Sequence, residues 1–310
     1  MFRYILKRLA AMIPVLLAVT FLMFALSSMS AGDPARVIAE KVYGHPTPEQ
    51  IDLIRHREGF DRPFVIQYVS WLKDVCRGDF GASYSSGKPA FTELTRHLPE
   101  TLKLAATSLV ILLLVSVPLG ILSALKENRL TDRIIQALTF VSVSLPSFWV
   151  GLMMLYIFGV KLRVISVIGG TSSSGIPIVA AITFDIGYFG ILIRLIRTNL
   201  TDVLKKDYIR ACRAKGLPAW KTVMKHGLKN SVTPVMTRGA SMAINMLCGS
   251  AVIETIFSIN GIGKTALEAV VSKDTPVLQC FILLLAAIVV AVNLLLDILY
   301  SVIDRRIQLT

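Results

Sequence analysis

Three stretches of the sequence carry residue types that could bind a partner or a solute. The segment from Asp207 to Pro234 is strongly basic and lies between long apolar runs. The stretch from Met236 to Cys248 holds Met and Cys side chains, which are soft ligands for transition metals. Glu254 follows as an acid within an apolar run, and such an acid usually faces a cavity or a partner. These patterns favour recognition and transport.

Chemical catalysis is not predicted. The sequence shows no nucleophile elbow, no zincin helix and no paired intramembrane carboxylates. Asn260 to Thr265 (NGIGKT) ends like a phosphate-binding loop, but that loop requires a glycine where Ser258 stands. We therefore expect a glycine-rich turn that leads into a short helix before Pro276. The four histidines lack the close spacing of metal ligands, so no metal site and no cofactor is predicted on this chain.

Two interpretations of the methionine-rich stretch stay open. In the first, the polar and soft side chains line a translocation pathway. In the second, the methionines pack in a core, which is the commoner use of Met at helical spacing. The pathway candidates are Met236, Met242, Asn245, Met246 and Glu254.

Composition indicates that a bilayer is the main solvent of this chain. Hydrophobic residues make up 54% and charged residues only 17%, and the mean hydropathy is +0.65. A spanning helix needs about 20 mostly apolar residues. Asp185 falls in one such run, where it indicates a shifted boundary or a bundle-facing position. We predict an all-α membrane protein with six transmembrane helices at 9–29, 102–125, 134–160, 176–193, 235–257 and 277–302.

The positions of Lys and Arg set the orientation, because short basic loops stay in the cytoplasm. The N-terminus, the 126–133 loop, the 194–229 loop and the tail (Arg305, Arg306) carry the excess positive charge. Both termini are therefore predicted to be cytoplasmic. The net charge of +13 suits loops beside anionic lipid, and nucleic-acid binding is not predicted.

This topology divides the chain into three parts. Residues 1–29 form the cytoplasmic N-terminus and the first transmembrane helix, which is better explained as an uncleaved anchor than as a signal peptide. Residues 30–100 form a small extracytoplasmic cap, with amphipathic helices expected at Pro48–His56 and Phe64–Val75. Residues 101–310 form a five-helix transmembrane core with a long cytoplasmic loop at about 198–233.

The long loop contains helix-ending and helix-starting residues that predict a helix, a sharp turn and a second helix. A helix from Leu200 to Lys215 would end at Gly216, where a left-handed cap is expected. Pro218 suits the first turn of the next helix, which would run to about Asn230 before Pro234 redirects the chain. A docking loop is the favoured interpretation, since a loop of this length rarely lacks a function. The alternative is a solvated, positively charged loop.

The same loop resembles a family signature. Asp207-Tyr208-Ile209-Arg210-Ala211-Cys212-Arg213-Ala214-Lys215-Gly216-Leu217 is similar to that of the inner-membrane permeases of ATP-binding-cassette importers, in the dipeptide, oligopeptide and nickel branch. Cys212 in place of Ala is a departure from it. Further matches along nearly the whole chain are Gly32-Asp33-Pro34-Ala35, Gly78-Asp79-Phe80-Gly81, Val117-Pro118-Leu119-Gly120-Ile121, Ser144-Leu145-Pro146-Ser147-Phe148-Trp149, Val252-Ile253-Glu254-Thr255-Ile256-Phe257 and Pro276-Val277-Leu278-Gln279-Cys280.

The resemblance implies a type I importer permease fold and a bacterial inner-membrane location. It implies one half of a pore, completed by a second homologous permease, and two ATPase subunits that hold ATP and Mg. An extracytoplasmic binding protein would deliver nickel, as a chelate, or short peptides. The residues of the matching motifs slightly favour nickel. The loop would act as the coupling helix, through Asp207, Tyr208, Arg210, Ala211, Cys212, Ala214, Lys215, Gly216 and Leu217.

Two other classes of function remain as alternatives. A self-sufficient secondary transporter or channel would not need an ATPase, and transport would survive disruption of the loop. A membrane scaffold would show no flux.

Overall fold

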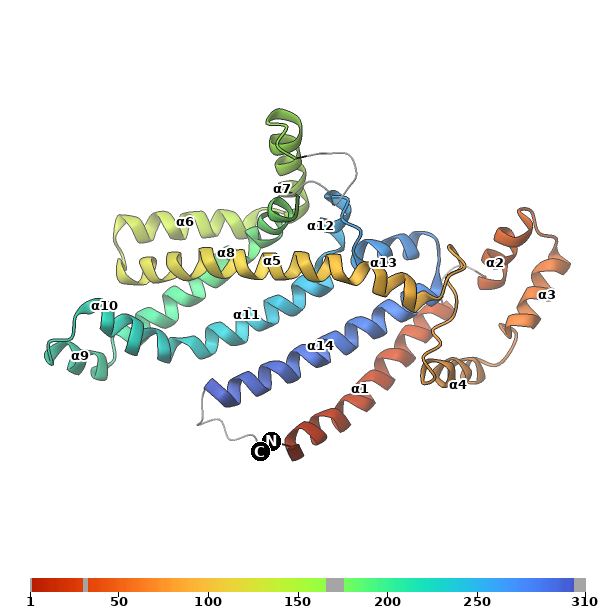
Figure 1. The fold of residues 1–310 in the computed structure, drawn as a ribbon, viewed down its shortest axis with the longest axis horizontal. Helices are drawn as coiled ribbons and strands as arrows, with labels where there is room; N and C mark the ends of the chain where they lie inside the picture. The colour runs from red at the N-terminus through yellow and green to blue at the C-terminus, as the bar shows by residue number, and fades with distance from the viewer. Residues whose placement is uncertain (1, 30–32, 166–175, 304–310) are drawn as a thin grey trace. The chain divides into compact units, whose positions relative to one another are not determined.

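The computed structural model describes residues 2–29, 33–165 and 176–303, which are almost entirely helical (Figure 1). Gly32, Arg305 and Arg306, used in the predictions above, lie outside these residues. An isolated bridge pairs Ala82 with Pro89. The helices are α1 (Phe2–Met29), α2 (Pro34–Tyr43), α3 (Pro48–Glu58), α4 (Phe64–Val75), α5 (Ala90–Leu125), α6 (Leu130–Ser144), α7 (Ser147–Met154), η1 (Leu155–Lys161), α8 (Ile176–Leu204), α9 (Asp207–Ala214), α10 (Ala219–Lys221), η2 (Thr222–Leu228), α11 (Lys229–Gly249), α12 (Ala251–Ile256), α13 (Ile262–Val271) and α14 (Thr275–Ile303).

Four of the described helices are long and apolar enough to cross a membrane. They are Ala10–Met29 in α1, Ala90–Leu125, Ile178–Leu204 and Thr275–Leu295, and they fall on the first, second, fourth and sixth predicted spans. The two helices predicted within 30–100 are also confirmed, as α3 and α4. The helix expected before Pro276 is present as α13, which begins directly after Gly261.

The prediction of one continuous third span at 134–160 is wrong. The chain bends by 98° between α6 and the helix made of α7 and η1. Leu145 and Pro146 are both extended at the break, with ψ near 129°. Proline disfavours the helical conformation in the residue before it, and its ring removes a backbone donor. The two pieces therefore make a fifth apolar span only if they are counted as one bent segment.

The structure also corrects the predicted ends of the loop helices. The helix expected from Leu200 to Lys215 is two helices, because α8 ends at Leu204 and α9 begins at Asp207. Pro234 does not redirect the chain, since it lies inside α11. The fifth predicted span, 235–257, is divided at Ser250 into α11 and α12. Neither helix is both long and apolar enough to cross a membrane by itself.

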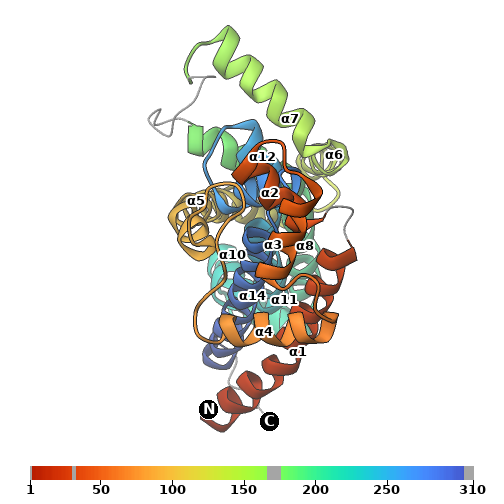
Figure 2. The ribbon, with the colours of Figure 1, turned by 90° about the vertical axis from the view of Figure 1, so that its right-hand side faces the viewer.

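The chain forms two compact units. The first holds Met1–Thr101 and Asn260–Leu294, and the second holds Leu102–Ile259 and the end of α14 from Leu295. In the first unit, α4 lies against α1 (Figure 2) through Phe21, Phe24, Tyr68 and Trp71, whose ring centroids are 5.4 to 5.8 Å apart across the two helices. A second cluster joins α13 and α14 to the start of α5.

In the second unit, α8 packs against α6, α7 and α11. Its apolar core draws on α5, α8, α11 and α12, with Leu112, Leu192 and Met246 fully buried. At Gly190, α8 lies very close to α6, because a Cβ at this position would lie 2.4 Å from the Thr139 carbonyl oxygen. Only glycine permits this contact, so the α6–α8 spacing depends on that residue.

Candidate functional site

The loop between α8 and α11 is built from short helical pieces. Asp207 lies in the first turn of α9, where a negative side chain is favourable to the helix dipole. At the other end of α9, the Leu217 N–H donates to the Cys212 carbonyl over 3.3 Å. Gly216 has φ +76°, which confirms the predicted left-handed residue. This closing turn leads through Pro218 into α10.

The loop has a buried side and an exposed side. Ile209 is fully buried and anchors α9. Four large apolar side chains of the loop are exposed, of which Trp220 is 65% and Met224 is 55% exposed. We call Tyr208, Leu217, Trp220 and Met224 the loop face. Several large apolar side chains exposed on one short loop suit an interaction surface.

The loop also exposes basic side chains. The Lys221 ammonium lies 5.6 Å from the centre of the Trp220 ring. Arg210 is exposed and pairs only loosely with Asp207, at 3.4 Å, and Lys215 is exposed as well. Exposed pairs of this kind contribute little to stability. The surface therefore presents apolar contact area together with positive charge.

A small core holds the loop on the rest of its unit. Leu200 of α8 and Val223 of η2 are buried against Ala124 of α5. Gly227 allows this approach, since a Cβ there would lie 3.1 Å from the Leu200 side chain. The loop is thus packed onto α5 and α8.

An ion pair with a buried carboxylate joins α6 to α8. Asp132 of α6, 2% exposed, accepts hydrogen bonds from Arg197 Nε at 2.7 Å and Arg197 Nη2 at 2.6 Å. It also accepts from Ser123 Oγ at 2.5 Å and from the Asn128 N–H at 2.9 Å. We call this set the Asp132 clamp. It joins α5, α6 and α8 with a bidentate geometry, which is the strong form of such a pair.

The clamp was not predicted from the sequence. Asp132 and Arg197 are separated by 65 residues, and each is a charged residue in a predominantly apolar helix. Buried charges of opposite sign are stable only when they are paired. A search for isolated acids and bases on different apolar helices could therefore have suggested the pair, although not its partners.

The predicted pathway residues are divided between the core and the surface. Met242 and Met246 are 2% and 0% exposed and pack in the main apolar core of the second unit. Asn245 lies exposed on the same helix, and Met236 is half-buried. For the two buried methionines, this placement agrees with the core-packing interpretation. The described ranges hold no group of three or more His, Cys, Asp or Glu that could bind a metal ion.

Two fully buried acids lie in this unit. Glu254 of α12 accepts a hydrogen bond from Ser250 Oγ at 2.7 Å. Asp185 of α8 accepts one from Ser108 at its Oδ1 atom, whereas Oδ2 has no partner among the described residues. Asp185 is 0% exposed, so its position within the bundle is confirmed.

Comparison with protein families gives two matches that together cover nearly the whole chain. Residues 116–309 match the family described as binding-protein-dependent transport system inner membrane component. Residues 1–105 match the N-terminal family of the same transport-system membrane components. The second match contains α1 to α4, and the first contains the loop face and the Asp132 clamp.

Similar proteins align along their full length. A probable peptide ABC transporter permease protein of Sinorhizobium fredii is 33% identical, over 98% of this chain and 99% of its own. A glutathione transport system permease protein of Escherichia coli (strain K12) is 33% identical over 99% of both chains. Among solved structures, an inward-facing MetNI methionine ABC transporter superposes with a TM-score of 0.58 at 18% identity, covering 68% of this chain and 96% of that chain.

Proposed function

Because the chain belongs to the family of binding-protein-dependent transport system inner membrane components, we propose that it forms half of the translocation pore of an ATP-driven importer of short peptides. The pore would be completed by a second, homologous permease. Two ATPase subunits would bind ATP and Mg, and this chain would hydrolyse nothing. An extracytoplasmic binding protein would deliver the substrate.

The loop face carries this proposal. Four exposed apolar side chains among cations suit a groove on a soluble partner, and the buried side of the loop is packed onto α5 and α8. Closure of the ATPase subunits would push on the loop face and move these helices as a rigid body. The residues in contact would be those of the family signature, from Asp207 to Leu217, with Trp220 and Met224 added.

The topology under this proposal keeps six spans. The bent pair formed by α6 with α7 and η1 would count as the third, and α11 with α12 as the fifth. The loop and both termini would then be cytoplasmic, in agreement with the distribution of Lys and Arg. Residues 33–88 would lie on the extracytoplasmic side, where the binding protein docks.

Peptides are favoured over nickel as the substrate. The names of the two full-length relatives specify a peptide and glutathione, which is itself a tripeptide. The slight preference for nickel that was inferred from the motif residues finds no support in these names. Asn245 and Glu254 stay as proposed pathway residues, because polar groups within membrane spans usually face a cavity or a partner. The half-buried Met236 stays with them as a proposal.

Uptake in cells that carry the full transporter tests this proposal. Labelled trialanine, glutathione and nickel are offered, with Gly216→Pro as the uncoupled control. Proline fixes φ near −65°, which is incompatible with the +76° of Gly216, and the turn after α9 is lost. We expect peptide uptake to fall by at least an order of magnitude in this variant, at an unchanged amount of membrane-inserted protein.

Gly216→Asn is the matched variant, because asparagine tolerates a positive φ, and it should keep most of the uptake. Normal uptake by Gly216→Pro would overturn coupling through the loop and favour the secondary transporter. Uptake of nickel but of neither peptide would overturn the substrate.

A further inference from the structure

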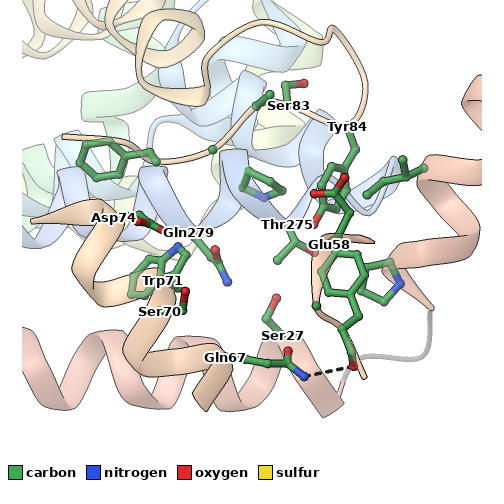
Figure 3. Close-up of a pocket in the computed structure, with 18 of the residues that line it drawn as sticks. Ser27, Glu58, Gln67, Ser70, Trp71, Asp74, Ser83, Tyr84, Thr275 and Gln279 are labelled. Carbon is green, nitrogen blue, oxygen red and sulfur yellow. Dashed lines mark hydrogen bonds between the residues drawn. The ribbon is translucent and has the colours of Figure 1, made fainter. Parts of the chain in front are cut away.

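The first unit contains a cavity of about 530 Å³ (Figure 3). Its walls come from the ends of α1 and α3, from α2 and α4, from the Asp79–Gly87 segment and from the first turn of α14. Aromatic rings make up much of the wall, namely Phe24, Phe60, Trp71, Phe80 and Tyr84. An apolar cavity with a few polar groups is the usual form of a small-molecule site.

The wall around Tyr84 is held by a buried acid that precedes α14. Asp274 is 2% exposed and accepts hydrogen bonds from Ser83 Oγ at 2.5 Å, from the Tyr84 N–H at 3.0 Å and from the Ser85 N–H at 2.9 Å. Lys41 of α2 donates to the carbonyl oxygens of Tyr84 and Ser85. This wall is therefore formed before any ligand binds. Burial, followed by the charge of Asp274, raises the pKa of Tyr84 above its usual value, so its phenol stays neutral.

Three polar groups at the cavity have no hydrogen-bond partner among the described residues. Trp71 Nε1 is buried and unpaired. Gln279 of α14 is only 6% exposed, and its side-chain amide makes no hydrogen bond within those ranges. The Asp74 carboxylate is likewise unpaired there, one helical turn after Trp71. Figure 3 shows all three toward one end of the cavity.

The donors and acceptors left unpaired at the cavity indicate which chemical groups a ligand must carry. Buried polar groups in native proteins are almost always hydrogen-bonded, so the unpaired Trp71 Nε1 beside the half-buried Asp74 and the Gln279 amide points to a missing ligand. Asp74 can accept from a cation, and Trp71 can only donate, which requires an acceptor such as a carbonyl oxygen. Gln279 can do either. An ammonium group close to a carbonyl is the amino end of a peptide.

We propose that this cavity binds the amino end of a short peptide, at a site formed by the ends of two apolar spans and the short helices α2 to α4. The Asp74 carboxylate accepts from the peptide ammonium, and the Trp71 N–H donates to the first carbonyl oxygen. Gln279 pairs with the following amide. Arg62, which also lines the cavity and has no ion pair among the described side chains, is the cation available for the peptide carboxylate. The proposal rests on the import of peptides proposed above and adds a second binding site to it.

Equilibrium binding to the full transporter in lipid nanodiscs, without ATP and without the binding protein, tests the site. The probes are labelled trialanine and its N-acetylated form, which lacks the ammonium. We expect Asp74→Asn to bind trialanine about tenfold or more weakly, since a hydrogen bond to a charged group is worth about 1.5–3 kcal/mol. Acetylation should weaken binding to the wild type by a similar factor and have little further effect on Asp74→Asn.

Glu49→Gln is the matched control, because Glu49 is an exposed acid on α3 that does not line the cavity. It should bind trialanine as the wild type does. Gln279→Leu should also lose affinity, which tests the site without a change of charge. Equal binding of the two probes by the wild type, or unchanged binding by Asp74→Asn, would overturn the proposal.

Two further outcomes separate this proposal from the first one. Gly216→Pro should bind trialanine normally while it fails to import it, so a failure of coupling leaves the binding result intact. If Asp74→Asn instead weakens capture of the binding protein while peptide binding is unchanged, the cavity is a protein-docking surface and the peptide site is wrong.

Discussion

Polar groups are paired in the Asp132 clamp and left unpaired at the cavity of the first unit. Each clamp oxygen has two donors, at 2.5 to 2.9 Å, and the three helices that it joins are in close contact. At the cavity, by contrast, Trp71, Asp74 and Gln279 have no partners within the described chain. Fully paired networks rigidify a structure, whereas unpaired groups are costly unless something binds them. The first region suits the transmission of a movement, and the second suits the reception of a ligand.

This contrast predicts where a substitution costs stability and where it costs binding. The largest effect on stability is expected at the clamp. Asp132→Ala leaves the half-buried Arg197 without its partner, and breaking a buried pair on one side costs about 3–5 kcal/mol. We expect a loss of that size in the free energy of unfolding of the purified chain in detergent micelles, measured by denaturant titration.

The matched control is the exposed pair of Lys205 and Glu127, whose charged atoms are 2.9 Å apart. Glu127→Ala should cost less than about 1 kcal/mol, because exposed pairs contribute little. The double variant Asp132→Ala/Arg197→Met should recover part of the loss, since it removes the unpaired charge. If Asp132→Ala lowers the free energy of unfolding no more than Glu127→Ala does, the clamp does not stabilise the packed helices.

A smaller effect is expected where α6 and α8 touch. Gly190→Ala places a Cβ 2.4 Å from the Thr139 carbonyl oxygen, so the helices must separate. Overpacking of this kind costs about 1–3 kcal/mol. Gly187→Ala is the control on the same helix, because a Cβ there meets nothing within 4 Å. It should be neutral or stabilise by up to about 1 kcal/mol. Equal unfolding midpoints for the two variants would contradict close packing of α6 on α8.

The smallest effect on stability is expected at the cavity. Gln279→Leu replaces an unpaired polar group by an apolar one of similar size, which is commonly neutral or slightly stabilising. We expect a change within about 1 kcal/mol in the same titration, in contrast to the loss of trialanine binding predicted for this variant. A cost above about 2 kcal/mol would show that Gln279 is a structural residue, and the contrast between the two regions would fail.

The turn after α9 is the part of the loop that was predicted best from the sequence. Gly216 and Pro218 are local signals, since each acts on the backbone within a few residues, and the left-handed turn was predicted from them. Ile209 and Tyr208 are neighbours in sequence, and only the packing of α9 decides that one is buried and the other exposed. Trp220 and Met224 were not predicted as contact residues, because their exposure depends on packing in the same way.

Helix continuity was harder to predict than helix existence. Pro146 breaks its segment by 98°, whereas Pro234 lies inside a helix that continues through it. The intrinsic cost of proline in a helix interior is the same in both, so the outcome depends on what the flanking segments pack against. Hydropathy averages over such differences, because it counts apolar residues and ignores contacts.

The membrane class, four of the spans, the family and the left-handed turn at Gly216 could be predicted from the sequence, because composition and local backbone chemistry act over short distances. Which polar groups meet depends instead on how the helices pack. Arg197 reaches Asp132 across 65 residues, and Gln279 joins Trp71 and Asp74 at one cavity from a helix about 200 residues away. The pairing of a buried polar group is a property of the packed helices that surround it.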